Sequence, residues 1–214
     1  IDMVSFTGGT QTGKHIAQIV APKFKKMSLE LGGKNPNIIF DDCDLEQAVK
    51  TSMHSSFANQ GQICLCGSRI YVQRGIYDRF KDEFVQRTKA RKVGPPSEES
   101  SQMGAIVSKA HYDKILSHIE LAKEEGGKIL AGGEALQMEG EHSQGWYIAP
   151  TIVEGLDEHC RTNQEEIFGP VVTLQPFDTE EEAISLANST GYGLAATIWT
   201  ESLSTAHRVA HTLH

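Results

Sequence analysis

Cysteine, long apolar runs and basic charge are all scarce in this sequence. Four cysteines occur in 214 residues without the spacing of a disulfide framework, which favours a reducing compartment. No apolar run reaches the ~18–20 residues of a membrane span, and no secretory signal is present. With 20 basic against 28 acidic residues, no basic stripe is available for a phosphate backbone. We therefore expect a cytoplasmic protein whose partners include neither a membrane nor a nucleic acid.

Metal ligands at useful spacing are also lacking. The nine histidines are scattered without an H-x(3)-H face, and we interpret them, His111 and His118 included, as surface or helix residues. No metal site is predicted. The two ends of the sequence also lack the signals of a domain boundary. Ile1–Met3 lead directly into a strand pattern, and the helical pattern of Ser204–His214 has no cap or glycine stop. We therefore expect a piece of a longer protein.

Strand and helix patterns alternate along the chain. Capping boxes predict helix starts at Asp44 and Thr179, and Ser108 opens another helix. This β-α order favours a parallel sheet with right-handed crossovers. The predicted fold class is α/β, a parallel β-sheet flanked by helices. We expect strands at residues 4–7, 27–31, 37–40, 69–73, 128–131, 146–153, 171–177 and 195–199.

Two of the four cysteines stand one residue apart in the segment Asn59–Arg69, N-Q-G-Q-I-C-L-C-G-S-R. Zinc sites usually pair cysteines as C-x(2–4)-C, and neighbouring C-x-C thiols bridge poorly. A buried structural thiol and a nucleophile remain as alternatives for Cys64. The polar, glycine-containing segment before Cys64 allows close approach of the backbone, which favours the nucleophile.

A glycine turn follows the first predicted strand. Gly8, Gly9 and Gly13 stand between that strand and an amphipathic helix, a geometry that can lay an anion on helix N-terminal amides. The pattern is G-G-x-x-x-G rather than the dinucleotide fingerprint G-x-G-x-x-G. A phosphate-binding turn and a plain tight turn both remain open.

A carboxylate ends the second predicted strand. Glu30 stands between Leu29 and Leu31, where it is either an exposed residue of a strand edge or a functional group. Burial beside these leucines would raise the pKa of Glu30 toward the range useful for a general base near neutrality.

Four stretches, in this order, resemble motifs of the aldehyde dehydrogenase superfamily. They are F-T-G-G with Gly13, L-E-L-G-G-K-N-P at 29–36, the cysteine segment, and E-E-I-F-G-P at 165–170. The resemblance covers essentially the whole chain, which covers less than half of a typical member. It is nearest to the muconic-semialdehyde branch, which includes family 8.

The resemblance implies a role for each motif. Cys64 corresponds to the catalytic nucleophile and Glu30 to the base that activates the deacylating water. Gly8 and Gly9 correspond to the turn beside the cofactor's pyrophosphate, and Leu31 is counted with the cofactor-binding residues. Gly9 and Gln11 stand where the family usually has serine and glutamate, so cofactor affinity is the property put in doubt.

The motif at 165–170 supplies the nicotinamide end of the implied site. Glu166 corresponds to the residue that holds the ribose hydroxyls, and Phe168 to the one that packs near the nicotinamide. The implied cofactor is NAD, with NADP as a possibility, and the implied substrate is a small aldehyde. A non-catalytic, crystallin-like or scaffold descendant of the fold and a cysteine esterase are the alternatives.

The resemblance also implies the domain organisation. Residues 1–32 correspond to the C-terminal remnant of an NAD-binding, Rossmann-like domain, and residues 33–214 to a catalytic domain truncated at its C-terminal end. The oxyanion-hole asparagine and the adenosine-binding lysine of the family would precede Ile1. We therefore expect the isolated chain to be inactive and the full-length parent to be a homodimer or homotetramer.

Overall fold

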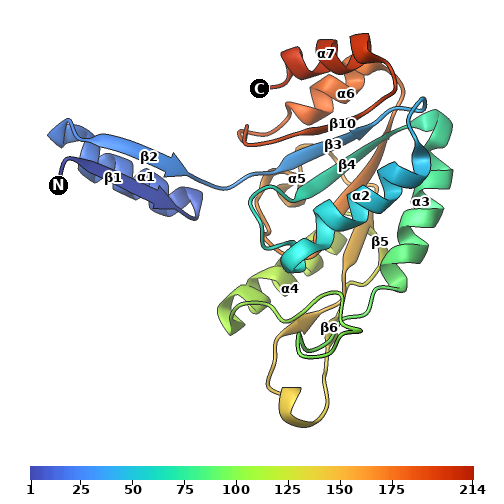
Figure 1. Ribbon diagram of the computed structural model, residues 1–214, viewed down its shortest axis with the longest axis horizontal. Coiled ribbons are helices and arrows are strands. Elements are labelled where there is room, and N and C mark those ends of the chain that lie inside the picture. The colour runs from blue at the N-terminus through green and yellow to red at the C-terminus, as the bar shows by residue number, and fades with distance from the viewer.

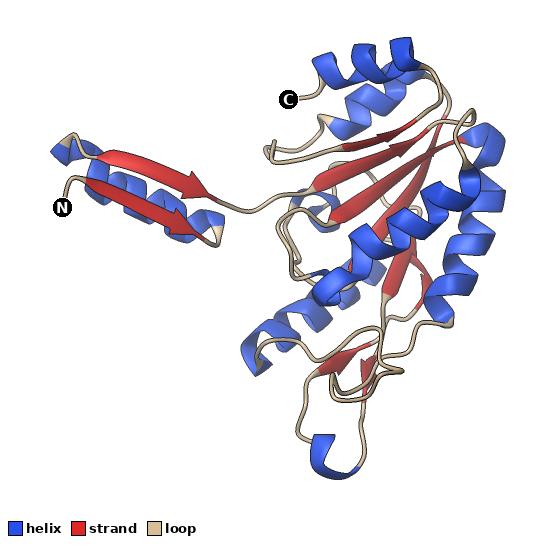
Figure 2. Cartoon of the chain, in the orientation of Figure 1, coloured by secondary structure: helices blue, strands red, loops and turns tan.

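The computed structural model describes residues 1–214 and has two units joined by extended chain (Figure 1). The N-terminal unit is a β-α-β element: β1 (Met3–Thr7), α1 (Thr10–Val20), the short 3-10 turn η1 (Ala21–Lys23) and β2 (Lys26–Glu30). The two strands pair in parallel, with Thr7 opposite Glu30. Helix α1 packs on one face of this pair and leaves the other face open (Figure 2).

The larger unit contains a six-stranded sheet with the strand order β10-β3-β4-β9-β8-β5. Every neighbouring pair is parallel except β5 with β8, so the predicted parallel sheet is confirmed except at this edge. An antiparallel neighbour needs no crossover helix, and the chain between β5 and β8 contains no α-helix, only the short 3-10 turn η3 (Gly140–His142). The strands are β3 (Asn35–Ile39), β4 (Gly67–Gln73), β5 (Lys128–Ala131), β8 (Thr151–Glu154), β9 (Val171–Phe177) and β10 (Thr197–Trp199).

The single strand predicted for residues 146–153 is wrong. The structure divides it into β7 (Tyr147–Ile148), which pairs with β6 (Ala135–Leu136), and β8, which joins the large sheet. Pro150 stands at the break, where its missing N–H cannot continue a strand ladder.

The helices begin where their caps predict. The side chains of Asp44, Ser108 and Thr179 each accept a hydrogen bond from the backbone N–H three residues later. Besides α1, the helical segments are α2 (Leu45–Phe57), η2 (Ala58–Gly61), α3 (Arg74–Lys89), α4 (Lys109–Glu124), η3 (Gly140–His142), α5 (Arg161–Gln164), α6 (Glu180–Ala187) and α7 (Leu203–Thr212).

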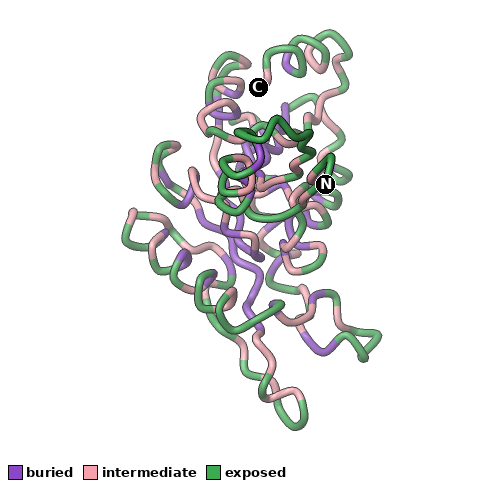
Figure 3. Tube along the Cα trace, turned by 90° about the vertical axis from the view of Figure 1, so that its left-hand side faces the viewer, coloured by how far each residue is buried: buried purple, intermediate pink, exposed green.

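Helices cover both faces of the large sheet. Successive strand residues point to opposite faces, so Ile38 packs toward α6 and α7 while Ile39 packs toward α2 and α3. Helix α4 lies on the same face as α6 and α7, where its Ile115 and Ile119 join the cluster of Val171. Buried residues concentrate in this unit, whereas the N-terminal unit is largely exposed (Figure 3). No helix has both the length and the apolar character that crossing a membrane requires.

A buried arginine holds the segment through which the chain enters the large sheet. Arg69 on β4 is 1% exposed, and its guanidinium donates to the carbonyls of Leu186 and Ala187, both at 2.8 Å, at the end of α6. Its Nε donates to the carbonyl of Lys34 at 2.8 Å. These bonds fix the chain between the two units, which places the glycines before Lys34.

Candidate active site

A cavity of about 480 Å³ lies between the two units. The residues on one side of the cavity come directly after β1 and β2, and those on the other side come before β4 and β9. The cavity therefore lies where the carboxyl end of the small sheet meets the amino end of the large sheet. Six of the seven predicted site residues line it. They are Gly8, Gly9, Leu31, Cys64, Glu166 and Phe168, and the remaining lining residues are Thr7, Gly32, Gln62, Ile63, His111 and Lys114.

The cysteine segment leaves α2 through a left-handed turn. Asn59, Gln60 and Gly61 have φ values of 47°, 59° and 69°. A Cβ on Gly61 would lie 2.2 Å from the carbonyl oxygen of Gly169, so only glycine fits there. This close approach brings the cysteine segment against the E-E-I-F-G-P segment. The glycine before Cys64 therefore serves backbone contact, as the sequence indicated.

Asn35 anchors the turn that carries both cysteines. Its Nδ2 donates to the carbonyls of Cys64 (2.7 Å) and Cys66 (3.0 Å). The backbone N–H of Cys64 makes no hydrogen bond within the chain and remains available to an oxyanion. Sequence reasoning missed Asn35 as a site residue, although it stands in the quoted motif G-G-K-N-P.

The two cysteines have different surroundings. Residues 63–66 form a turn, which is closed by the hydrogen bond from the Cys66 N–H to the Ile63 carbonyl. Cys64 lines the large cavity, while Cys66 lines only a neighbouring void of about 20 Å³. Burial raises the pKa of the Cys66 thiol, which disfavours its thiolate. Both differences favour Cys64 as the nucleophile.

Glu166 and Phe168 approach the cavity from the segment before β9. One Glu166 carboxylate oxygen accepts the Gly33 N–H at 3.0 Å, and a Cβ on Gly32 would lie 2.3 Å from the other. The glycines that join the two units therefore leave space for this carboxylate. Phe168 has a left-handed φ of 58°, unusual for an aromatic residue, and turns the chain toward β9.

The N-terminus of α1 provides the anion-compatible end of the cavity. Its N-cap, Gly9, makes no side-chain capping bond, and no acidic residue stands in the first turn. The free N–H groups and the positive end of the helix dipole suit a phosphate group. A cofactor could therefore lie with its pyrophosphate at Gly8–Gly9 and its nicotinamide end at Glu166 and Phe168.

Glu30 is the predicted site residue that does not line the cavity. Its backbone carbonyl accepts the Gly8 N–H at 3.0 Å, and the residue is exposed. Of the two alternatives left open for Glu30, the structure has the exposed one, because the two-stranded sheet is covered by α1 alone and its other face is open. Leu31 follows on the opposite side, where it touches Gly13 of α1.

His111 and Lys114 of α4 also line the cavity. His111 and His118 lie in a helix, as the sequence interpretation allowed, but both also make contacts that it did not foresee: His111 bonds the Phe168 carbonyl at 2.6 Å, and His118 is only 8% exposed. Their spacing of i and i+7 on one helix face was a signal that could have indicated a shared partner.

Known proteins resemble the chain over its whole length. It is 48% identical to the 2-aminomuconic semialdehyde dehydrogenase of Mus musculus over 215 aligned positions, covering 100% of this chain and 44% of that protein. It is 45% identical to 4-trimethylaminobutyraldehyde dehydrogenase A of Danio rerio, covering 98% and 42%. The chain thus spans less than half the length of these relatives.

The fold agrees with these matches. A crystal structure of betaine aldehyde dehydrogenase from Staphylococcus aureus in complex with NAD⁺ superposes with a TM-score of 0.94 at 43% identity, covering 100% of this chain and 42% of that one. The model of the aldehyde dehydrogenase family matches residues 1–214. The chain belongs to the aldehyde dehydrogenase family.

Proposed function

We propose that this chain supplies the catalytic cysteine and the nicotinamide-binding residues of an NAD(P)-dependent aldehyde dehydrogenase. The observation that carries the proposal is the shared cavity of Cys64, Glu166, Phe168 and the N-terminus of α1. The relatives whose names describe aldehyde oxidation, and the matched structure that contains NAD⁺, support the same reading.

Cys64 begins the reaction. Its thiolate adds to the aldehyde carbonyl to form a thiohemiacetal, and the free backbone N–H of Cys64 donates to the oxyanion. When bound, NAD(P)⁺ supplies the acceptor for the hydride that leaves the same carbon. Loss of that hydride converts the thiohemiacetal to a thioester on Cys64.

Glu30 completes the reaction by taking a proton from water, whose oxygen attacks the thioester. The carboxylic acid leaves and the Cys64 thiolate is restored. Because Glu30 is exposed and lies outside the cavity lining, its side chain must turn toward Cys64 for this step. The carboxylate is free to turn, since its side chain makes no hydrogen bond or ion pair in the structure.

Glu166 and Phe168 orient the nicotinamide end. A carboxylate can accept hydrogen bonds from two ribose hydroxyls, and an aromatic ring keeps water from the hydride path. The N–H of Gly33 holds the Glu166 carboxylate toward the cavity at 3.0 Å. Gly8, Gly9 and Leu31 contribute the opposite wall, where the free backbone N–H groups at the N-terminus of α1 suit the pyrophosphate.

The domain organisation is part of the proposal. Residues 1–32 are assigned to a cofactor-binding unit and residues 33–214 to a catalytic unit, a division supported by the separate sheets and the extended chain between them. We further infer a cytoplasmic enzyme with a small aldehyde as substrate, assembled as a homodimer or homotetramer.

A chimera tests the proposal. Residues 1–214 replace the matching segment of the Staphylococcus aureus betaine aldehyde dehydrogenase, and NADH formation is followed with aldehydes such as aminomuconic semialdehyde. We expect sustained NADH formation that Cys64→Ser abolishes and Cys66→Ser largely retains. A chimera that folds and releases acid from esters but forms no NADH would instead indicate an esterase. A folded chimera without either activity would indicate a scaffold.

A further inference from the structure

We propose that three residues on one face of helix α4 position the cofactor-contacting segment Glu165–Phe168. These residues, His111, Lys114 and His118, are called the α4 clamp below. The inference rests on the proposed function, because that function assigns Glu166 and Phe168 to the nicotinamide end of the cofactor.

The clamp contacts successive parts of the segment. The His111 Nε2 lies 2.6 Å from the carbonyl oxygen of Phe168, and the Lys114 Nζ donates to the carbonyl of Glu166 at 2.9 Å. The His118 Nε2 lies 3.3 Å from a carboxylate oxygen of Glu165. Positions i, i+3 and i+7 share one helix face, so the helix and the segment run antiparallel alongside each other.

Phe168 is the residue that most needs such a restraint. A left-handed backbone costs a non-glycine residue about 1–2 kcal/mol, and it persists where surrounding contacts determine it. His111 contacts Phe168 twice, through the carbonyl bond and through edge packing of the rings, whose centroids lie 5.9 Å apart. The aromatic ring is thereby fixed at the cavity wall.

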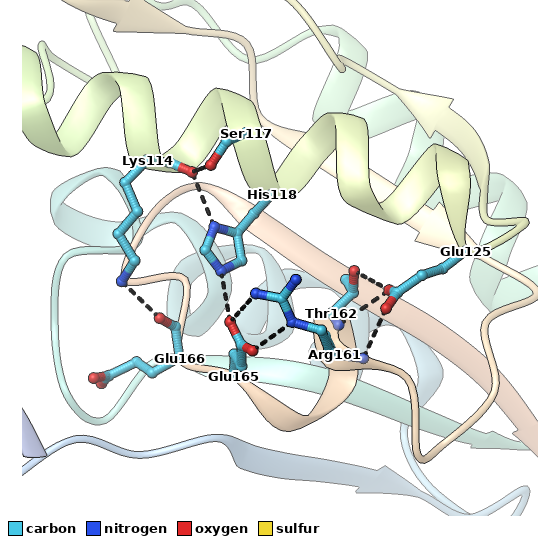
Figure 4. Close-up of polar contacts among 8 residues, drawn as sticks. All are labelled: Lys114, Ser117, His118, Glu125, Arg161, Thr162, Glu165 and Glu166. Carbon is cyan, nitrogen blue, oxygen red and sulfur yellow. Dashed lines mark hydrogen bonds and ion pairs between the residues drawn. The ribbon is translucent and has the colours of Figure 1, made fainter.

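Glu166 is restrained on two sides. Lys114 holds its backbone carbonyl, while the Gly33 N–H holds its side chain. Figure 4 shows the Lys114 side chain reaching the Glu166 carbonyl while the Glu166 carboxylate points away from α4. The cofactor-facing carboxylate therefore depends on α4 for its backbone position.

A second group of hydrogen bonds connects the C-terminal end of α4 to the residues before Glu165. Glu125, next to the helix, accepts both backbone N–H groups of Arg161 and Thr162, at 2.8 and 3.1 Å, at the start of α5. Arg161 in turn donates to Glu165 at 2.7 Å, on the carboxylate that His118 contacts (Figure 4). Residues 161–168 are thus held along the whole helix.

His118 connects α4 to Glu165 through both of its ring nitrogens. Its Nδ1 lies 2.9 Å from the Lys114 carbonyl and its Nε2 lies 3.3 Å from the Glu165 carboxylate. The charged groups near this ring are Glu165, Arg161 on the same carboxylate, and the Lys114 ammonium directed at the Glu166 carbonyl.

NMR relaxation of the 214-residue chain without cofactor tests the clamp directly. We expect backbone order parameters of about 0.85 at residues 166–168, falling below about 0.6 in His111→Leu and in Lys114→Met. His111→Gln, which keeps a donor, should restore the order, and Lys123→Met on the exposed part of α4 is the matched control. Unchanged order parameters at β9 show that a variant is folded. Unchanged values at 166–168 in both loss variants would overturn the proposal.

His118→Leu tests the third contact of the clamp. Leucine can bond neither the Lys114 carbonyl nor Glu165, so we expect the order parameter at residue 165 to fall, while His159→Gln, an exposed control, should keep the wild-type value. An unchanged order parameter at residue 165 in His118→Leu would contradict the role of His118.

An NAD titration, followed by the amide shifts of Gly8 and Gly9, connects the clamp to the cofactor. We expect affinity to fall about tenfold in His111→Leu and to remain within twofold in Lys123→Met. A loosened segment with unchanged NAD affinity would overturn the positioning role. If the wild-type 214-residue chain shows no NAD-induced shift, the same affinities are compared in the chimera, where a complete lack of NAD binding would contradict the proposed function; the cofactor-free order parameters decide on the clamp in either case.

Discussion

Gly61 provides the sharpest test of how the cysteine turn is built. In Gly61→Ala the new Cβ meets the carbonyl oxygen of Gly169 at 2.2 Å, and φ stays at 69°. The left-handed backbone costs alanine about 1–2 kcal/mol, and the overlap with rigid backbone adds about 1–3 kcal/mol. We therefore expect a loss of about 2–5 kcal/mol in the free energy of unfolding, measured by urea denaturation.

A matched control separates the two costs. Gly155 also has a left-handed φ, of 83°, but a Cβ there meets nothing within 4 Å. Gly155→Ala should therefore lose only about 1–2 kcal/mol. Gly61→Ala should in addition change the rate at which iodoacetamide alkylates Cys64, because the turn must move away from Gly169. A loss no larger than that of Gly155→Ala, with unchanged Cys64 alkylation, would refute the close approach.

Three further predictions concern charged groups. In the chimera described above, Glu30→Gln should give a burst of NADH followed by slow turnover, because the thioester forms but is hydrolysed slowly. Glu166→Gln should instead slow hydride transfer and give no burst. Stopped-flow absorbance distinguishes the two variants, and equal loss of the burst in both would refute the division of roles. Arg69→Met should destabilise the chain by about 2–4 kcal/mol in urea denaturation, because buried carbonyls lose their donor, and a change below about 0.5 kcal/mol would contradict this. The hydrogen bond from Arg161 lowers the pKa of Glu165, so this carboxylate should stay ionised at pH values below the usual glutamate pKa of ~4.3. The ionised carboxylate stabilises the folded state at neutral pH, and this contribution should be lost as pH falls through the pKa of Glu165 in the folded protein. Arg161→Gln should raise the NMR titration midpoint of Glu165, and an unchanged midpoint would contradict this origin.

Local signals in the sequence predicted much of the fold. Asp44 and Thr179 indicate where helices begin, because each side chain accepts a hydrogen bond from the backbone N–H only three residues later. Strand patterns likewise depend on residues close in the sequence. The break at Pro150 was equally local, since proline cannot donate to a ladder, but the apolar pattern on both sides obscured it. The antiparallel direction of β5 depends on how the chain returns between 132 and 150, which no local pattern encodes.

The residues of the candidate site were predicted mainly from their resemblance to family motifs, and only partly from the physical properties of the residues themselves. The cysteine turn and Glu166 come together because Gly61 packs on Gly169, a contact between residues far apart in sequence. The exposure of Glu30 follows from the open face of a two-stranded sheet, which the apolar neighbours of Glu30 did not reveal. The contacts of the clamp histidines were missed because their partners stand about fifty positions later in the sequence, and His111 bonds a backbone carbonyl, which has no side-chain signature.

The most direct test of the central claim is to locate the acyl group on the protein. The Glu30→Gln chimera is incubated with an aldehyde and NAD⁺, quenched in acid and digested, and fragmentation spectra are read for the peptide that contains both neighbouring cysteines. The account predicts a thioester on Cys64, formed only when NAD⁺ is present. A thioester on Cys66, or one that forms equally without NAD⁺, would contradict it.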